Sequence, residues 1–416
     1  MRYSQLFTKT SKTVSAEEVA KNAQLLLRAG FIHKEMAGVY AYLPLGLRVF
    51  EKIKNIVREE MNALGSQELT MTSLQPKEVW EQTDRWDDEK VDVWFKSKLK
   101  NGTEVGFGWS HEEPITTMMK EFVSSYRDLP FSVYQFQNKL RNETRAKSGI
   151  MRTREFVMKD MYTYTKTEAE LTDFYDATTQ TYLKIFSRVG LGDVTYLTAA
   201  SGGAFTQFSH EFQTVVEAGE DTIYIDREKK VAINEEVYTD EVISQLGLNK
   251  DTLEKVRAAE VGNIFNFGTT KSEQIGLYFQ DENGERKPVY LSSYGIGIGR
   301  LMGVVVEYFA DEKGLVWPAA IAPYTVYVAL LGKDDSTRAT ADALYSQLVS
   351  AGVEVFYDDR EESAGAKLAD ADLMGMPVRV VVSEKSLAAG GVEVKKRTEA
   401  ESQIMSEDEL VKFLKG

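Results

Sequence analysis

The fold of this chain is set by a segment that reads Leu140-Arg141-Asn142-Glu143, then a loop from Thr144 to Gly149, then Met151-Arg152-Thr153-Arg154-Glu155-Phe156-Val157-Met158-Lys159-Asp160. Apolar residues on both sides of the loop predict two strands joined by a basic connection. Between Lys139 and Lys159 seven residues are basic and two are acidic, a local charge of +5 in a chain whose net charge is −14. A run of charges is usually a solvated face, but these arginines are interleaved with Met151, Phe156, Val157 and Met158, which favours a partly buried polyanion site. Arginine also carries a permanent charge and a planar fork that binds phosphate oxygens, such as those of a triphosphate.

A second conspicuous segment is the glycine-rich run Tyr294-Gly295-Ile296-Gly297-Ile298-Gly299-Arg300, which precedes an apolar helix predicted over Leu301 to Phe309. Its spacing does not fit a dinucleotide-binding fingerprint, and the chain has no Walker-type phosphate loop. Two interpretations stay open for the run on its own: a ligand-binding segment that uses Arg300, or a tightly packed turn between a strand and a helix.

Length and composition limit the class of protein. A chain of 416 residues suggests two or three domains, and 43% hydrophobic with 27% charged residues is typical of globular proteins. No apolar run approaches the roughly 20 residues that cross a bilayer, and the first residues do not form the apolar core of a signal peptide. We therefore expect a cytoplasmic protein with no membrane partner.

Metal chemistry is limited by the residues that the chain lacks. It has no cysteine, which excludes disulfides and thiolate zinc sites, and its three histidines, His33, His111 and His210, are far apart. No metal site built by protein side chains alone is predicted, and any metal is expected to be Mg²⁺ held by carboxylates and a nucleotide. The net charge of −14 argues against a nucleic-acid partner, although the basic run described above offsets that argument.

Turn residues and apolar periodicity predict an antiparallel sheet flanked by helices. Hairpins are expected around Asn101-Gly102, between 92–98 and 103–109, and around Asn283-Gly284, between 275–280 and 287–293. The capping-box pair Ser15 and Glu18, followed by Val19, Ala23, Leu26 and Leu27, predicts a helix that ends at Gly30. An apolar stripe over 49–64 predicts a second helix that ends at Gly65.

The pattern changes at the proline-flanked stretch 317–323, which reads Trp-Pro-Ala-Ala-Ile-Ala-Pro. Beyond it, strands predicted at 325–331, 353–357 and 378–382 alternate with helices that begin at Ser336 and near 361–374. This alternation is typical of a small parallel or mixed α/β domain.

Taken together, these segments resemble the three motifs of the class II aminoacyl-tRNA synthetases, and most closely the prolyl-tRNA synthetases. Motif 1 matches about 46–76, motif 2 about 139–160 and motif 3 about 294–307. The prolyl assignment depends on further stretches: Ser110-His111-Glu112-Glu113-Pro114, Met158-Lys159-Asp160, Ser209-His210-Glu211-Phe212, Gly268-Thr269, and Val316-Trp317-Pro318 before Ala322-Pro323. The resemblance spans nearly the whole chain, including Asp358-Asp359-Arg360 and Gly375-Met376-Pro377 in the C-terminal part. The resemblance implies an α+β fold, with a class II catalytic domain over 1–322 and an α/β anticodon-binding domain over 323–416.

The resemblance also implies an activity: an aminoacyl-tRNA ligase that activates L-proline with ATP and Mg²⁺ and loads it onto the tRNA for proline, acting as a homodimer. It assigns the ATP site to Arg141, Glu143, Arg152, Phe156, Gly299 and Arg300, and the proline site to Ser110, Glu112, Arg141, Met158 and His210. Arg141, Arg152 and Arg300 are the residues expected to act directly in catalysis. For His210 a structural role inside the fold is an equal alternative.

Two other functions stay open at this point. A threonyl-type synthetase shares the motif geometry, although the absence of cysteine and of a clustered metal site argues against it. A non-catalytic, tRNA-binding paralogue is the other alternative, and such proteins typically lose the phosphate-binding arginines that this chain keeps.

Several positions depart from the family pattern. Thr72 stands where motif 1 usually ends in proline, and Phe205-Thr206-Gln207 replaces a glycine-rich stretch of the amino-acid pocket. Family members of the editing type carry an inserted domain between motifs 2 and 3 that hydrolyses misloaded alanyl-tRNA. Here that region holds only the short acidic segment 226–261, so the resemblance is to the form that lacks the editing insertion.

Overall fold

The computed structural model describes residues 1–144, 146, 148–201 and 208–415. The chain divides into two compact units. The first, here called the sheet unit, comprises Met36–Val39 and Lys54–Val304, and the second, the terminal unit, comprises Met1–Glu35, Tyr40–Ile53 and Val305–Gly416. Both mix helices with strands, which confirms the predicted α+β class.

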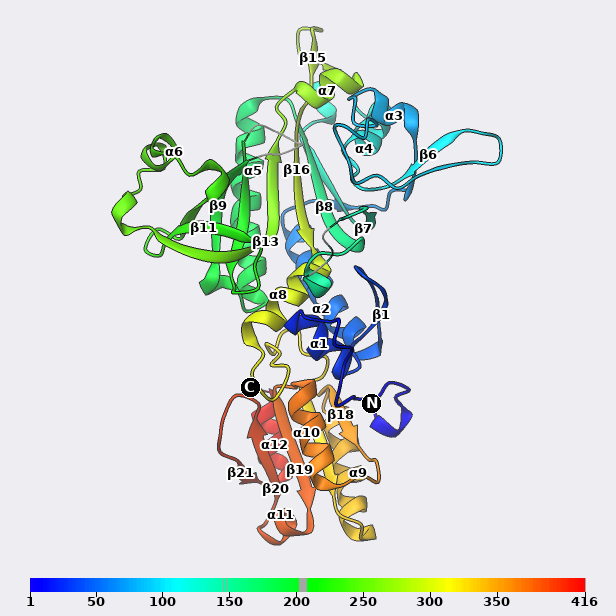
Figure 1. Cartoon of the computed structure of the whole chain (residues 1–416), viewed down its shortest axis with the longest axis vertical. Helices are drawn as coiled ribbons and strands as arrows, with labels where there is room; N and C mark the ends of the chain where they lie inside the picture. Colours follow the sequence, from blue (N-terminus) through cyan, green and yellow to red (C-terminus); the bar gives the residue numbers. More distant parts are fainter. Residues whose placement is uncertain (145, 147, 202–207, 416) are drawn as a thin grey trace. The chain divides into compact units, whose positions relative to one another are not determined.

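The sheet unit contains a nine-stranded sheet in the order β10-β9-β12-β11-β13-β16-β8-β7-β3, with an additional pairing of β10 with β13 (Figure 1). All pairings are antiparallel except β12 with β9 and β3 with β7. The strands are β3 (Gln67–Glu68), β7 (Phe131–Leu140), β8 (Glu155–Thr165), β9 (Thr195–Ser201), β10 (Phe208–Val215), β11 (Asp221–Asp226), β12 (Val231–Asn234), β13 (Glu254–Asn266) and β16 (Tyr290–Gly297).

The helix α5 (Glu168–Arg188) packs on this sheet against β8, β13 and β16 (Figure 1). Its N-terminus is capped by the Thr167 side chain, which accepts a hydrogen bond from the Glu170 backbone N–H at 3.2 Å. Its sheet-facing residues include Tyr182, Ile185 and Phe186, which have no exposed surface. The central strands are thus covered on one face, which leaves the other face for a ligand.

The remaining helices of the sheet unit are short: α3 (Lys77–Glu81), α4 (Glu112–Met119), α6 (Asp240–Gln245) and α7 (Thr270–Ile275). Two longer helices contribute residues to both units: α2 (Pro44–Ala63), which confirms the second predicted helix, and α8 (Ile298–Phe309), which follows the glycine-rich run.

Both predicted hairpins form, but outside the main sheet. β5 (Lys96–Lys98) pairs with β6 (Glu104–Phe107) in a three-stranded sheet with β4 (Leu74–Pro76), and β14 (Tyr278–Gln280) pairs with β15 (Arg286–Pro288). Gly102 and Gly284 adopt φ angles of 91° and 79°, which the turns require and a side chain would oppose. The flanking strands are shorter than predicted, since Ile275 ends α7 and residues 290–293 belong to β16.

The helix predicted from Ser15 is wrong in its start. α1 covers only Lys21–Arg28, and its N-cap residue, Ala20, makes no side-chain capping bond. Glu18 accepts hydrogen bonds from Lys34 Nζ at 2.9 Å and from the Tyr40 hydroxyl at 3.2 Å, instead of capping a helix. Val19 is 76% exposed, so the apolar period does not extend to it.

The terminal unit contains a five-stranded sheet in the order β18-β17-β19-β20-β21. β17 pairs parallel with β18 and with β19, whereas β20 pairs antiparallel with β19 and with β21. It comprises β17 (Val326–Leu331), α9 (Asp335–Ser350), β18 (Val355–Asp358), α10 (Ala364–Met374), β19 (Val378–Ser383), α11 (Glu384–Ala388), β20 (Val392–Lys396), β21 (Gln403–Met405) and α12 (Glu407–Lys415). The predicted mixed α/β pattern is confirmed for its first five elements. The short two-stranded sheet of β1 (Ile32–Met36) and β2 (Val39–Tyr42) precedes α2.

Across the part of the chain that the structure describes, no helix combines the length and the apolar character that a bilayer span requires.

Candidate active site

A row of paired residues crosses the open face of the nine-stranded sheet. Glu211 on β10 pairs with Asn263 on β13, Asn263 with Gly295 on β16, Gly295 with Asp160 on β8, and Asp160 with Gln135 on β7. Four of these five residues line one pocket; Gln135, which bonds Asp160, is not among its lining residues. Residues two apart along a strand share a face, which explains why Phe156, Met158, Asp160 and Tyr162 of β8 all line it.

Gly295, in the middle of this row, has no room for a side chain. A Cβ atom on Gly295 would lie 2.7 Å from Asn263 Oδ1 and 3.4 Å from Met158 Sδ. The Gly295 backbone N–H donates to the same Asn263 oxygen at 3.2 Å. Of the two interpretations of the glycine-rich run, this geometry supports a ligand-facing floor formed by β16.

A β-bulge in β13 brings a further carboxylate to the pocket. Phe212 of β10 pairs with Gly262 but the next residue, Gln213, pairs with Glu260, so Val261 is the extra residue. Strict alternation would place Glu260 and Asn263 on opposite faces, but with the bulge Asn263 Nδ2 donates to Glu260 Oε1 at 2.9 Å.

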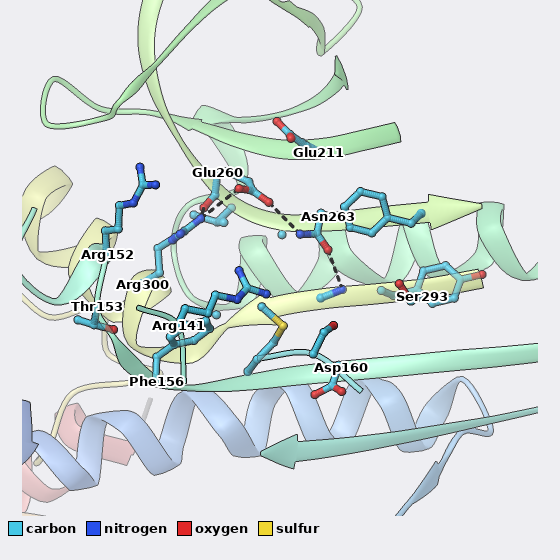
Figure 2. Close-up of a pocket in the computed structure, with 18 of the residues that line it drawn as sticks. Arg141, Arg152, Thr153, Phe156, Asp160, Glu211, Glu260, Asn263, Ser293 and Arg300 are labelled. Atoms are coloured by element: carbon cyan, nitrogen blue, oxygen red, sulfur yellow. Dashed lines mark hydrogen bonds and ion pairs between the residues drawn. The ribbon is translucent and has the colours of Figure 1, made fainter. Parts of the chain in front are cut away.

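Arg300, in the first turn of α8, is fixed by two segments. Its Nε donates to the Met151 carbonyl at 2.8 Å, and its Nη1 forms an ion pair with Glu260 Oε2 at 3.1 Å. Figure 2 shows the continuous chain of contacts from Arg300 through Glu260 to Asn263.

Arg141, just beyond the end of β7, lies in the same pocket and has no salt-bridge partner among the described residues. Its Nε donates to the Trp109 carbonyl at 3.2 Å, and its guanidinium carbon lies 5.3 Å from the centroid of the Phe156 ring. Burial lowers the pKa of Arg141, and the charge of Arg300 lowers it further. A half-buried cation beside another cation favours an anionic ligand.

Arg152 is engaged by carboxylates. It forms ion pairs with Glu143 at 2.9 Å and with Glu220 at 2.6 Å. Burial lowers the pKa of Arg152, but these two carboxylates outweigh it and raise the pKa above its ordinary value. Two of the six residues that the resemblance assigns to ATP, Arg152 and Glu143, therefore bond to each other in this structure.

Ser110 and Glu112 lie side by side at another part of the pocket. The Ser110 hydroxyl donates to Glu112 Oε2, and both residues are almost fully buried. Glu112 is the first residue of α4, where a negative charge is stabilised by the helix dipole.

A buried network supports the pocket behind Asp160. Asp160 Oδ2 accepts hydrogen bonds from Lys139 Nζ at 2.9 Å, Gln135 Nε2 at 2.9 Å and the Tyr162 hydroxyl at 2.7 Å. His111 Nδ1 lies 2.6 Å from Lys139 Nζ. Burial, together with the Lys139 charge, lowers the pKa of His111 to about 4, so this histidine is neutral and accepts from lysine.

Of the other predicted site residues, Phe156 and Met158 line the pocket, whereas Gly299 and His210 are not among its lining residues. Gly299 lies buried in the first turn of α8. His210 Nδ1 lies 2.6 Å from the Tyr175 hydroxyl of α5, because residues 210 and 211 of β10 point to opposite faces and Glu211 takes the pocket face. This placement favours the structural alternative for His210. The predicted pocket segment Phe205-Thr206-Gln207 lies outside the described residues, as do Arg145 and Lys147 of the basic run.

Several pocket residues were not identified from the sequence: Tyr162, Glu211, Glu220, Glu260, Asn263 and Ser293. Burial and the neighbouring Glu260 raise the pKa of Glu211 to about 8, which marks an excess of negative charge on this side of the pocket. Among the described residues no group of three or more histidine or acidic side chains could hold a metal alone. Glu211 and Glu260 could hold Mg²⁺ together with nucleotide phosphates, the mode that this ion prefers.

Comparison with known proteins agrees with this geometry. The family model for the tRNA synthetase class II core domain (G, H, P, S and T) matches residues 95–309, and the model for the anticodon binding domain matches 325–416. A proline–tRNA ligase of Rhizorhabdus wittichii is 36% identical over 439 aligned residues that cover 100% of both chains. One from Zymomonas mobilis subsp. mobilis is 37% identical over 438 residues, covering 100% of this chain and 98% of its own length.

Among solved structures, the prolyl-tRNA synthetase of Giardia lamblia in complex with prolyl-adenylate superposes with a TM-score of 0.77 at 19% identity, covering 93% of this chain and 74% of its own. At that identity the likeness shows the fold. The full-length sequence relatives and both domain models show that the chain belongs to the proline–tRNA ligase family of class II aminoacyl-tRNA synthetases.

Proposed function

We propose that this chain catalyses the two-step reaction of its family: L-proline and ATP give prolyl-adenylate and pyrophosphate, and the prolyl group then passes to tRNA. The observation that supports it best is the convergence of Arg141, Arg152 and Arg300 on one pocket whose floor is the bare backbone of Gly295. The relatives named above are proline–tRNA ligases, so neither the threonyl nor the non-catalytic alternative has support.

The chemistry of the first step asks for positioning and charge stabilisation. The carboxylate of proline is already ionised at neutral pH, so its attack on the α-phosphorus needs no general base. The P–O bond to pyrophosphate breaks as the new acyl–phosphate bond forms, and negative charge builds on the phosphate oxygens. Arg141 faces the pocket without a salt-bridge partner among the described residues, which suits contact with the α-phosphate and the proline carboxylate.

Arg152 and Arg300 are proposed to hold the terminal phosphates of ATP. Arg152 forms an ion pair with Glu220 and Arg300 with Glu260. The phosphates of ATP can replace these carboxylates as the anionic partners of the two arginines. Phe156 offers an aromatic face for the adenine ring, and Glu143 offers an acceptor for its amino group. In this proposal Glu143 and Arg152 exchange their mutual ion pair for contacts with ATP.

Ser110 and Glu112 are proposed to bind the cationic imino group of proline, because a buried ammonium-type charge requires a carboxylate partner. Met158 contributes an apolar wall beside Gly295. Mg²⁺ bound by the nucleotide would neutralise phosphate charge, and Glu211 and Glu260 are the described carboxylates that would hold it. The raised pKa of Glu211 is the observation that suits a nearby cation.

For tRNA selection we propose the family division of labour, with catalysis in 1–322 and anticodon binding in 323–416. The second family model, over 325–416, supports that division. A homodimer is proposed on the resemblance alone, and sedimentation of the purified protein tests it. The cytoplasmic location that the sequence predicts stays a prediction.

The central test is Arg300→Ala, measured by proline-dependent exchange of pyrophosphate into ATP. Loss of a charge-stabilising donor at the reacting centre is expected to lower the exchange rate at least about 100-fold. Arg141→Ala is expected to do the same. A near-normal rate in a folded Arg300→Ala protein would refute the phosphate assignment.

The matched control is Arg227→Ala. Arg227 also forms a carboxylate ion pair, with Glu254 at 2.7 Å, but it is exposed and lies outside the pocket. Its exchange rate is expected to equal that of the wild type, which separates the loss of a pocket arginine from the loss of any paired arginine.

A further inference from the structure

Arg85 is a buried arginine that the proposed function does not use. It is 4% exposed, its backbone N–H donates to the Trp80 carbonyl at 3.1 Å, and Trp94 Nε1 donates to its carbonyl at 2.8 Å. Its guanidinium carbon lies 4.4 Å from the ring centroid of Trp109 and 5.4 Å from that of Trp80. The two hydrogen bonds thus fix the backbone of Arg85, and the two indole rings pack against its guanidinium.

The guanidinium bonds two consecutive carboxylates through one nitrogen. Arg85 Nη1 lies 2.8 and 3.0 Å from the two oxygens of Glu113, and 3.4 Å from Glu112 Oε2. Glu113, with no exposed surface, also accepts from Lys271 Nζ at 2.6 Å and from the Thr83 hydroxyl at 2.9 Å. The cluster therefore contains two carboxylates and two cations.

This balance keeps both members of the Arg85–Glu113 pair ionised. Burial lowers the pKa of Arg85, but Glu113 and Glu112 outweigh it and raise the pKa. Burial raises the pKa of Glu113, but Arg85 and Lys271 outweigh it and lower the pKa. With two cations against two carboxylates, Arg85 attracts Glu112 as well as Glu113, and both carboxylates contribute to its raised pKa.

The two oxygens of Glu112 consequently have different roles. Oε2 accepts from the Ser110 hydroxyl and faces Arg85, whereas Oε1 has no hydrogen bond within the described ranges and Glu112 lines the pocket. We propose that Arg85 is a positioning residue for amino-acid recognition: it fixes Glu112 through Oε2 so that Oε1 meets the imino group of proline.

A fixed carboxylate suits this substrate. The nitrogen of proline belongs to a ring, so its two N–H bonds point in directions that the ring sets, whereas a primary ammonium rotates its three N–H bonds freely. A carboxylate of fixed direction therefore contributes most to the binding of a cyclic amine. The inference depends on the proposed role of Glu112, and the experiment is designed so that the two can fail separately.

The experiment measures the KM for proline and the KM for ATP in pyrophosphate exchange with Arg85→Lys. Lysine keeps the buried charge, but its side chain is shorter, so its ammonium does not reach the position of Nη1 between the two carboxylates, and it does not stack on the two indole rings as a planar guanidinium does. The KM for proline is expected to rise about tenfold while the KM for ATP stays within about twofold. A KM for proline within about twofold of the wild type would overturn the proposal.

A double-mutant cycle with Glu112→Gln shows whether Arg85 acts through Glu112. Glu112→Gln alone is expected to raise the KM for proline, and adding Arg85→Lys is expected to cause little further rise. An equal further rise would show that Arg85 acts independently and would overturn the inference. An unchanged KM for proline in Glu112→Gln itself would instead refute the assignment of Glu112 in the proposed function.

Arg188→Lys is the matched control, because Arg188 also bonds two consecutive glutamates, Glu59 at 2.5 Å and Glu60 at 2.7 Å, away from the pocket. It is expected to leave both KM values unchanged. If Arg85→Lys does not fold, the charge-neutral double variant Arg85→Gln with Glu113→Gln provides the same test, with the same rise expected and the same result contradicting it.

Discussion

At the scale of single residues, the pocket combines Arg141, which has no salt-bridge partner among the described residues, with an excess of negative charge at Glu211 and Glu260. The raised pKa of Glu211 shows where negative charge is in excess. Burial and the neighbouring Glu260 raise its pKa to about 8, against about 4.3 for a glutamate in an unfolded chain. Between these two pH values the native state keeps a proton that the unfolded state has lost.

The sign of the resulting effect on stability follows from linkage. Where the native state binds more protons than the unfolded state, the free energy of unfolding falls as pH rises. The contribution of Glu211 is therefore fully present below about pH 4, is lost as pH rises through about 8, and is constant above that value.

Glu211→Gln removes this titration and gives a direct test. We expect the free energy of unfolding of the variant, relative to that of the wild type, to increase between pH 5 and pH 8, measured by urea denaturation at several pH values. Glu217→Gln, an exposed residue on the same segment, is the control and should follow the wild type. Parallel profiles for Glu211→Gln and the wild type would contradict the raised pKa.

The three arginines predicted for the site have a chemical signature in the chain itself, whereas Ser110, Glu112 and Met158 were assigned through the family resemblance. Arg141, Arg152 and Arg300 stand out in basic or glycine-rich runs, and the structure brings all three to one pocket. Glu211 and Glu260 could not be assigned from the sequence. Glu211 faces the pocket because of strand alternation in β10, and Glu260 faces it because of a bulge in β13 that no local sequence pattern predicts. Arg85 likewise gains its role only when folding brings it to Glu112 and Glu113.

At the scale of elements, the close packing of α8 on the turn at Gly149–Met151 positions Arg300. A Cβ atom on Gly303 of α8 would lie 2.7 Å from Met151 Cγ and 3.0 Å from Ile150 Cγ1. The Met151 carbonyl in this turn is the group that holds Arg300 Nε. A change in the helix-to-turn distance is therefore transmitted to Arg300.

Gly303→Ala is expected to lower both stability and activity. Alanine in place of glycine inside a helix favours folding by up to about 1 kcal/mol, whereas overpacking a tight contact costs about 1–3 kcal/mol, so the net effect is destabilising. Displacement of the turn should lower the exchange rate about tenfold, since errors of about 1 Å in positioning cost up to about 100-fold. Thermal unfolding and pyrophosphate exchange measure the two effects.

Gly365→Ala is the control for that variant. Gly365 lies in α10, and a Cβ atom there meets no neighbour within 4 Å. It should leave the exchange rate unchanged and stability unchanged or higher by up to about 1 kcal/mol. Normal activity in Gly303→Ala would show that the turn adapts without moving Arg300.

Elements with strong local signals were predictable, and those that depend on distant partners were not. Asn101-Gly102 and Asn283-Gly284 specify their turns, and both hairpins form, but which sheet each joins depends on contacts outside the hairpin. Ser15 and Glu18 have the spacing of a capping box, but Glu18 instead accepts hydrogen bonds from Lys34 and Tyr40. These tertiary contacts cannot be predicted from the local sequence.

At the scale of the whole molecule, the region between motifs 2 and 3 is part of the catalytic sheet. The segment 226–261 was predicted to be too short for an independent editing domain. In the structure the end of β11, the strand β12 and much of β13 lie in this segment, and all three strands belong to the nine-stranded sheet. Outside the strands this segment contains α6, the 3-10 helices Glu235–Val237 and Lys250–Thr252 and short turns, which is too little for a second core.

This arrangement leads to a prediction about errors. Proline and alanine share a carboxylate and a cationic amine, so Arg141 and Glu112 accept both, and a smaller side chain cannot be excluded by size. The missing methylenes are worth only about 1–3 kcal/mol each in an apolar pocket. We therefore expect measurable alanine-dependent pyrophosphate exchange, weaker than that with proline.

Correction of that error is expected to be absent from this chain. Hydrolysis of alanyl-tRNA needs a pocket that admits alanine and excludes proline, separate from the site of activation, and the segment that could hold one is used for strands of the sheet. The measurement is deacylation of purified alanyl-tRNA specific for proline, with heat-inactivated protein as the control for spontaneous loss. Arg300→Ala, which should lack activation, serves as a second control, because a hydrolytic site elsewhere in the chain would survive that substitution. Deacylation above the spontaneous rate by both the wild type and Arg300→Ala would reveal such a site and contradict the prediction. Rates equal to the spontaneous rate would mean that the alanyl-tRNA made by this enzyme persists until another protein hydrolyses it.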